Sequence, residues 1–331
     1  MTSKVLITGI AGLLGSHFSR YLLAKGYDVV GIDDFSGGFK ENIADGIYCS
    51  TINLSDLAAV DKFFKEHRFD YVYHFAAYAA EGLSPFIRKF NYTNNLIASA
   101  NLITSSINYD VKKFIFTSSM AVYGSSNIPP FTEDMQPCPI DPYGVAKYAV
   151  EMDLKLAQEQ FGLDYTIIRP HNVVGVYQNI WDRYRNVIGI WIRKTLNNEP
   201  LTIFGDGLQK RAFSDMEFYN EPFEKVMTQF GGEIFNIGAD KERTLLETAH
   251  LVQKCASNFG YKPDIVHLEA RHEAKFAFSD HKKAKTLLNF EDNTNLELTI
   301  NKMFEWALTQ PNREIKNMKY ETVKNIYTFW K

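Results

Sequence analysis

A tyrosine and a lysine four residues apart, Tyr143 and Lys147, form the pattern in this sequence that is best suited to acid-base chemistry. On a helix, side chains at this spacing lie one above the other on the same face. The positive charge of the lysine would favour the phenolate and so lower the pKa of the tyrosine, giving a base that can take a proton from a hydroxyl group near neutral pH. Alone the pattern is weak, because such a pair usually forms a solvated face.

The composition bounds the class of protein. A chain of 331 residues suits one large domain or two closely joined domains. Its net charge of −3 gives no indication of the basic surface that binding to nucleic acid or to an anionic membrane would need. Cys49, Cys138 and Cys255 are scattered and lack metal-ligand spacing, which favours a reducing compartment and predicts no metal site. No apolar run approaches a membrane span, and no signal peptide is visible. We therefore expect a soluble, cytoplasmic protein.

The first thirty residues predict a strand, a glycine-rich turn, a helix and a second strand. Residues 4–8 form a short apolar run typical of a buried strand, and an apolar periodicity after the turn predicts a helix that ends near Gly26. Residues 27–32 predict the second strand. In such a unit the glycines let the backbone approach a pyrophosphate, whose charge is stabilised at the helix N-terminus. The alternative is a turn that merely joins a strand to a helix.

The acidic end of the second strand indicates which dinucleotide would bind. Asp33 is placed to bind the ribose hydroxyls of adenosine, and its charge would repel a 2′-phosphate. The sequence therefore predicts NAD rather than NADP as the cofactor. The residues of the turn that we expect at the cofactor are Gly9, Gly12, Leu13, Leu14 and Gly15.

Together, the glycine motif of residues 9–15 and the Tyr-x-x-x-Lys motif resemble the extended short-chain dehydrogenase/reductase family, which includes the nucleotide-sugar epimerases and dehydratases. The resemblance runs to about Leu308. It implies an α/β fold, with a Rossmann-type doubly wound parallel sheet and a smaller mixed α/β C-terminal lobe that binds substrate. We expect residues 1–172 to form the NAD-binding domain, with a last strand near 233–238 returning to it, and residues 173–331 mainly to form the nucleotide-sugar-binding lobe.

The resemblance also implies further contacts with NAD. Asn53 and Leu54 fall where the family places a polar-aliphatic pair at the adenine. The strand over residues 70–75 and the small residues after it would pass close to the cofactor, and an asparagine in a long helix predicted over residues 86–107 matches one that faces the cofactor side of the sheet. These residues are Phe75, Ala76, Ala77 and Asn95. His74, inside the apolar strand, is interpreted as structural.

The end of the strand over residues 113–119 carries a run of hydroxyl residues, and α/β folds bind ligands at this edge of the sheet. By resemblance, Ser119 is the third catalytic residue beside Tyr143 and Lys147 and hydrogen-bonds the reacting oxygen. Thr117 and Ser118 are the alternatives if the alignment slips.

The two residues after Ser119 help to distinguish between the reactions that members of the family catalyse. Dehydratases and decarboxylating relatives carry acidic residues there, whereas this chain has Met120 and Ala121, which cannot carry a proton. The cysteine that 3,5-epimerases of the family carry there is also missing. This favours oxidation and reduction at a single carbinol.

The substrate residues are likewise implied by the resemblance. Asn172 matches the family asparagine that binds the substrate diphosphate, and Arg211 matches its diphosphate arginine. Arg271 lies where the family keeps another phosphate or ribose ligand, although His272 and Glu273 replace the usual Gly-Asp after it. A guanidinium binds phosphate oxygens in a bidentate manner, which a lysine cannot do.

Several residues near these motifs are interpreted as structural or solvated. His171 is taken as structural in preference to a substrate contact. Arg183 and Arg185, in an amphipathic helix predicted over residues 182–193, are taken as surface charges. The tail after Pro311 matches nothing in the family and is either a packing strap or a partner contact.

Three functions can be compared. The first is an NAD-dependent nucleotide-sugar 4-epimerase with a transient 4-keto intermediate. The second is a dehydrogenase or reductase of a nucleotide sugar with net redox change, and the third is a non-catalytic NAD-binding scaffold. The resemblance implies a homodimer. The sequence leaves open the nucleotide base, the sugar and the stereocentre.

Overall fold

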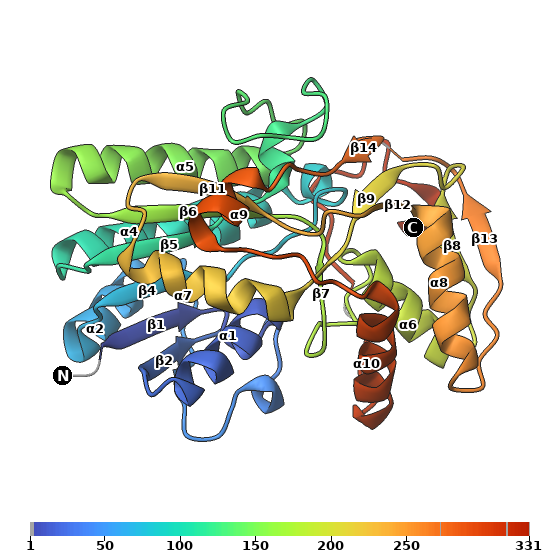
Figure 1. Ribbon diagram of the computed structural model, residues 1–331, viewed down its shortest axis with the longest axis horizontal. Coiled ribbons are helices and arrows are strands. Elements are labelled where there is room, and N and C mark those ends of the chain that lie inside the picture. The colour runs from blue at the N-terminus through green and yellow to red at the C-terminus, as the bar shows by residue number, and fades with distance from the viewer. Residues whose placement is uncertain (1–2, 272, 316, 331) are drawn as a thin grey trace.

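The structure, a computed structural model, describes residues 3–271, 273–315 and 317–330, so His272 lies outside the described residues. Its centre is a seven-stranded parallel sheet (Figure 1). In spatial order the strands are β11 (Glu233–Ile237), β6 (Tyr165–Pro170), β5 (Lys113–Thr117), β4 (Tyr71–His74), β1 (Lys4–Thr8), β2 (Asp28–Ile32) and β3 (Tyr48–Ser50). The chain order reverses at β1, which pairs with β2 on one side and β4 on the other. This confirms the predicted Rossmann-type fold.

Helices cover both faces of the sheet because its strands are apolar on both sides. In β1, Leu6 packs on one face, whereas Val5 and Ile7 pack on the other. The first face carries α2 (Leu57–His67), α4 (Ala98–Asn108) and α5 (Pro142–Phe161), and the second carries α1 (Leu13–Ala24), α7 (Asn220–Thr228) and α9 (Lys282–Leu288). The chain after residue 172 therefore supplies one strand, β11, and two helices, α7 and α9, of the sheet layers.

The remainder of the C-terminal half forms a smaller mixed α/β lobe beyond one end of the sheet (Figure 1). Its elements are α6 (Val187–Leu196), α8 (Leu245–Ser257), α10 (Leu296–Thr309), β8 (Leu201–Phe204), β9 (Lys210–Ala212), β12 (Glu242–Thr244), β13 (Ile265–Leu268) and β14 (Phe276–Ala277), with the short pair β7 (Val173–Val174) and β10 (Ser214–Asp215) between it and the sheet. The helix predicted over residues 182–193 begins only at Val187, because Asn186 has φ of 61° and its side chain caps the helix at Gly189.

The helix that carries Tyr143 and Lys147, α5, has strong signals at both ends. The Asp141 carboxylate accepts hydrogen bonds from the N–H groups of Tyr143 and Gly144. The helix ends at Gly162, which adopts the left-handed conformation with φ of 77°.

The face that α5 packs on the sheet is set by its first turn. Val150, Leu154 and Ala157 are buried in the core, whereas Met152, Leu156 and Phe161 are exposed. The reason is the helical period, because burial of Tyr143 and Lys147 brings residues 150 and 154 to the same face. Among the described residues, none of the helices is both long enough and apolar enough to cross a membrane.

The long helix predicted over residues 86–107 is interrupted. It consists of α3 (Arg88–Tyr92), a π-helical turn (Thr93–Ile97) and α4. The π turn carries Asn95, whose amide oxygen accepts from the N–H of Tyr78 at 2.9 Å and whose nitrogen donates to the Tyr78 carbonyl at 3.1 Å. The turn therefore ties this helix to the loop that follows β4.

The C-terminal tail is a packing strap. Ile326 and Trp330 are buried against Leu83 and Tyr184, and the Glu321 carboxylate accepts from two backbone N–H groups at the start of α3. The tail thereby braces the loop between β4 and α3.

The structural interpretation of His74 is supported by its hydrogen bonds. It is buried in β4, with Nδ1 2.8 Å from the Thr8 hydroxyl and Nε2 2.9 Å from the Ser99 hydroxyl. Because Ser99 donates its own proton to the Asn95 carbonyl, Nε2 of His74 is the donor to Ser99 and Nδ1 accepts from Thr8. A neutral ring thus satisfies both bonds. Burial, and then the charge of Lys147, lower the pKa of His74 to about 3.

We predict that this buried neutral ring makes the fold sensitive to acid. Below about pH 6.5 the unfolded chain binds a proton at this position that the folded chain does not, so the free energy of unfolding falls by about 1.4 kcal/mol per pH unit down to about pH 3. Urea denaturation between pH 4.5 and 7.5 measures this slope. His74→Gln should reduce it, and His250→Gln, at an exposed position of α8, is the control. An unchanged slope in His74→Gln would contradict the prediction.

Candidate active site

A cavity of about 450 Å³ lies at the C-terminal edge of the sheet, between the strand ends and the smaller lobe. It is lined by residues that follow β1, β2, β4, β5 and β6. The expected site residues that line it are Gly9, Gly12, Leu13, Leu14, Asp33, Asn53, Leu54, Phe75, Ala76, Ala77, Ser119, Tyr143, Lys147, Asn172, Arg211 and Arg271. Gly15 packs beneath the turn, and Asn95 holds the Tyr78 loop from behind.

The turn after β1 is shaped for a ligand that needs close contact with the backbone. Gly9 has φ of 69°, and a Cβ there would lie 2.8 Å from the backbone of Ala76. A Cβ at Gly15 would lie 2.3 Å from the Gly9 carbonyl. No side chain caps the N-terminus of α1, whose N–H groups and dipole favour an anion. These features fit the pyrophosphate of a dinucleotide.

Asp33 is fixed at the end of β2 by two backbone hydrogen bonds. One carboxylate oxygen accepts from the N–H of Ala11 at 2.9 Å, and the other accepts from the N–H of Phe35 at 2.8 Å. Burial raises the pKa of Asp33, and these two hydrogen bonds oppose the rise. The remaining lone pairs of the carboxylate can accept from ribose hydroxyls.

Tyr143 and Lys147 are brought together as predicted, but the expected activation of the tyrosine is not what the structure shows. The Lys147 ammonium lies 5.8 Å from the centre of the Tyr143 ring and donates to the Thr117 carbonyl at 2.7 Å. Burial, and then the Glu81 carboxylate, raise the pKa of Tyr143, and the Ser119 hydroxyl opposes the rise. Burial lowers the pKa of Lys147 to about 7. The energetic cost of burying both charged groups is not visible in the spacing of the two residues.

Of the three hydroxyl residues at the end of β5, Ser119 is the one whose side chain hydrogen-bonds Tyr143. The hydroxyl of Ser118 donates to Glu151 at 2.5 Å, and Glu151 forms a buried ion pair with Arg169. Thr117 offers its carbonyl to Lys147. Ser119 accepts from the N–H of Ala121 at 3.1 Å and keeps its own proton for a ligand or for Tyr143.

The opposite end of the cavity carries two arginines that share one carboxylate. Arg211 and Arg271 each lie 3.2 Å from the same oxygen of Glu273. Two guanidinium groups against one carboxylate leave a positive charge, which suits a diphosphate. Asn172, with φ of 43°, donates to the Ala212 carbonyl at 3.2 Å and lines the cavity beside them.

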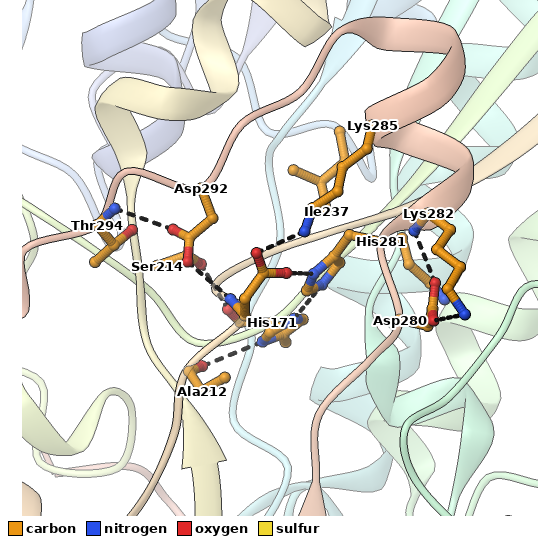
Figure 2. Close-up of polar contacts among 12 residues, drawn as sticks. His171, Ala212, Ser214, Ile237, Asp280, His281, Lys282, Lys285, Asp292 and Thr294 are labelled. Atoms are coloured by element: carbon orange, nitrogen blue, oxygen red, sulfur yellow. Dashed lines mark hydrogen bonds and ion pairs between the residues drawn. The ribbon is translucent and has the colours of Figure 1, made fainter.

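His171 is structural, as expected. Figure 2 shows its ring against that of His281, with their Nε2 atoms 2.8 Å apart. Nδ1 of His171 lies 3.1 Å from the Ala212 carbonyl, and Nδ1 of His281 lies 3.0 Å from Asp240. This buried chain of contacts links β9 of the smaller lobe to the loop after β11. It holds Ala212 in place, and with it the neighbouring Arg211.

Two residues at the cavity were missed in the sequence. Arg185 was taken as a surface charge, but it lines the cavity, stacks 4.6 Å over the Tyr78 ring and pairs with Asp182 at 2.8 Å. Glu81, in the loop after β4, also lines the cavity and lies close enough to Tyr143 to affect its pKa. Neither belongs to a motif. The one feature of the sequence that could have drawn attention to Glu81 is its position, followed by Gly82, inside the otherwise apolar stretch 79–83.

Comparisons with known proteins show the family to which the chain is similar. A model of the NAD dependent epimerase/dehydratase family matches residues 5–238. The UDP-glucose 4-epimerase of Halalkalibacterium halodurans is 28% identical over 326 residues, which cover 93% of this chain and 96% of the relative. The crystal structure of a UDP-glucose 4-epimerase with UDP-glucose from Thermotoga maritima has a TM-score of 0.87 and 32% identity, covering 92% of this chain and 98% of that one. That of a UDP-glucose 4-epimerase with NAD from Thermus thermophilus has a TM-score of 0.86 and 26% identity, covering 92% and 99%.

We predict that Asp33→Asn weakens binding of NAD by about 10-fold or more, because a hydrogen bond to a charged group contributes about 1.5–3 kcal/mol. The substitution should also relieve the repulsion of a 2′-phosphate and so reduce the preference for NAD over NADP. Isothermal titration calorimetry with each cofactor measures both effects. Asp28→Asn, an exposed position at the start of β2, is the control. An unchanged ratio of the affinities for NAD and NADP would show that Asp33 does not contact the adenosine ribose.

Proposed function

The chain belongs to the NAD-dependent epimerase/dehydratase family, and we propose that it is a nucleotide-sugar 4-epimerase. The proposal rests on the combination of residues that line the cavity. Tyr143, Ser119 and Lys147 meet between a cradle suited to a dinucleotide and an arginine pair suited to a diphosphate. Met120 and Ala121, which follow Ser119, have no acid or base for elimination. Oxidation and reduction at one carbinol is the chemistry that these groups serve best.

In the proposed reaction Tyr143 takes the proton of the sugar 4-hydroxyl, and Ser119 hydrogen-bonds the same oxygen. NAD, held by the turn after β1 and by Asp33, would supply the acceptor for the hydride of that carbon and the donor for its return. The 4-keto sugar must turn over in the cavity, so that C4 regains its hydrogen on the other face while Tyr143 gives the proton back to the oxygen. Lys147 is held in place by its hydrogen bond to the Thr117 carbonyl. When the lysine is protonated, its positive charge stabilises the Tyr143 phenolate.

The relatives support UDP as the nucleotide, and the UDP-glucose 4-epimerases among them support glucose or galactose as the sugar. Other relatives are a UDP-glucuronate 4-epimerase and a UDP-N-acetyl-alpha-D-glucosaminuronate decarboxylase, so the sugar is the part of the proposal that the assay below must decide. The Arg211–Glu273–Arg271 cluster supports the diphosphate. A dehydrogenase or reductase of the same substrates would begin with the same proton and hydride transfer, and a silent scaffold would need neither Tyr143 nor Lys147.

We also infer a homodimer in the cytoplasm. The outer face of α5 exposes Val145, Met152 and Leu156, which form an apolar strip along one helix. A second copy of the same helix would cover such a strip symmetrically. Light scattering should give the mass of two chains, and Leu156→Glu should give one. A monomeric wild-type protein would remove this part of the proposal.

The catalytic proposal predicts epimerisation without lasting reduction of NAD. Purified protein is incubated with UDP-, GDP-, CDP- and dTDP-sugars, while proton NMR follows the stereochemistry and absorbance follows NADH. Tyr143→Phe should lower kcat by about 10²–10⁴-fold, since it removes the acid-base group. Tyr148→Phe, just over one turn along α5, is the matched control.

The outcomes separate the epimerase from the dehydrogenase, and conversion of none of the sugars would leave the non-catalytic scaffold. Catalytic formation of the epimer without accumulation of NADH is expected. NADH that accumulates only while NAD is supplied would indicate a dehydrogenase and contradict the proposal. A Tyr143→Phe variant with full activity would contradict the role of the tyrosine in either reaction.

A further inference from the structure

Glu81 is held next to Tyr143 by a short relay of hydrogen bonds. The hydroxyl of Ser84 lies 2.8 Å from the Glu81 carbonyl, and it accepts from the N–H of Tyr143 at 3.2 Å. The same hydroxyl lies 3.3 Å from the Asp141 carboxylate that caps α5. The turn that carries Glu81 is therefore bonded directly to the first turn of the helix that carries the proposed base.

On its other side this turn lies beside the arginine pair. A Cβ at Gly82, the next residue, would lie 3.6 Å from a guanidinium nitrogen of Arg271 and 3.9 Å from the Trp330 ring. Ala80 and Leu83, on either side of the Glu81–Gly82 step, are buried in a cluster with Trp330 of the tail. The loop is thus fixed between Tyr143 and Arg271, and the tail holds it there.

The three acidic side chains at this end of the cavity differ in whether other groups of the protein pair with them. The carboxylate of Glu273 is neutralised by Arg211 and Arg271, and Asp141 is engaged by backbone N–H groups. The side chain of Glu81, in contrast, makes no hydrogen bond or ion pair with the part of the chain that the structure describes, and it lines the cavity. It is therefore available to a ligand.

A sugar that spans the site must pass this carboxyl group. If its reacting hydroxyl lies at Tyr143 and its diphosphate at Arg211 and Arg271, the ring occupies the space that Glu81 borders. We propose that Glu81 determines the class of sugar, by hydrogen-bonding the hydroxyl or amino substituents of a hexose and repelling the carboxylate of a hexuronic acid. This inference rests on the proposed function and names its substrate class.

The chemistry of the carboxyl group supports that selection. An ionised carboxylate accepts from hydroxyl and ammonium donors, whereas a second carboxylate beside it in a partly desolvated cavity is repelled. The Glu81 side chain is exposed to solvent at the cavity, but the protein atoms around it desolvate its carboxyl group. This desolvation, and then the charge of Asp141, raise the pKa of Glu81 to about 7, with Glu273 acting in the same direction and Arg211 and Arg271 opposing it. Glu81 therefore carries its charge above about pH 7, and rejection of a uronate should strengthen as pH rises through that value.

The test is the binding of UDP-glucose and UDP-glucuronic acid, which differ at C6, measured by calorimetry. At pH 8 the wild-type protein should bind the glucose derivative at least about 10-fold more tightly than the glucuronic acid derivative. Glu81→Gln should remove most of this preference, mainly by tighter binding of the glucuronic acid derivative. Glu269→Gln, an exposed acid outside the cavity, should keep it. At pH 6 the wild-type preference should shrink, whereas that of Glu81→Gln should not change.

The readouts keep this inference separate from the proposed function. Binding needs no turnover, so a protein that binds both sugars without epimerising them would contradict the epimerase and still test Glu81. Equal preference in wild type and Glu81→Gln, or a wild-type preference for the uronic acid, would overturn the role of Glu81. A lower melting temperature in Glu81→Gln with an unchanged preference would likewise assign the residue a structural role.

Discussion

The hydrogen bond from Lys147 to the carbonyl of Thr117 is the contact on which the arrangement of this site depends. It joins the first turns of α5 to the end of β5 at 2.7 Å, with the ammonium group almost completely buried. Because Tyr143 lies one turn earlier on the same face, this bond also fixes the phenol above the strand end that carries Ser119. Burial lowers the pKa of the lysine to about 7 and raises that of the tyrosine, so desolvation is the main influence on the pKa of both groups.

Charges at the cavity are balanced by groups from distant parts of the chain. Arg211 on β9 and Arg271 before β14 meet at Glu273, and the buried contact of His171 with His281 ties β9 to the sheet. The tail reaches back to the loop after β4. The smaller lobe is thereby fixed against the sheet at the place where the proposed substrate lies, which favours a site that is formed before the ligand arrives.

Local patterns in the sequence were enough to predict most of the fold. The branched residues of β1, the glycines at 9, 12 and 15 and the acid at Asp33 are close together in the chain, so their spacing was enough to predict the cofactor cradle. What depends on distant contacts was not predictable. The start of α6 follows from the backbone of Asn186, the pKa of Tyr143 from burial by several elements, and the place of Glu81 from its relay to α5. The strap formed by the tail has no local signature at all.

The most direct test of transient oxidation at C4 is the fate of the hydrogen on that carbon. A nucleotide hexose that carries deuterium at C4 is converted in ordinary water, and the product is examined by NMR. If the hydride leaves and returns within one site, the epimer retains deuterium at C4. Replacement of the label by hydrogen from water would mean that the stereocentre inverts through removal of a proton, and it would contradict the central claim.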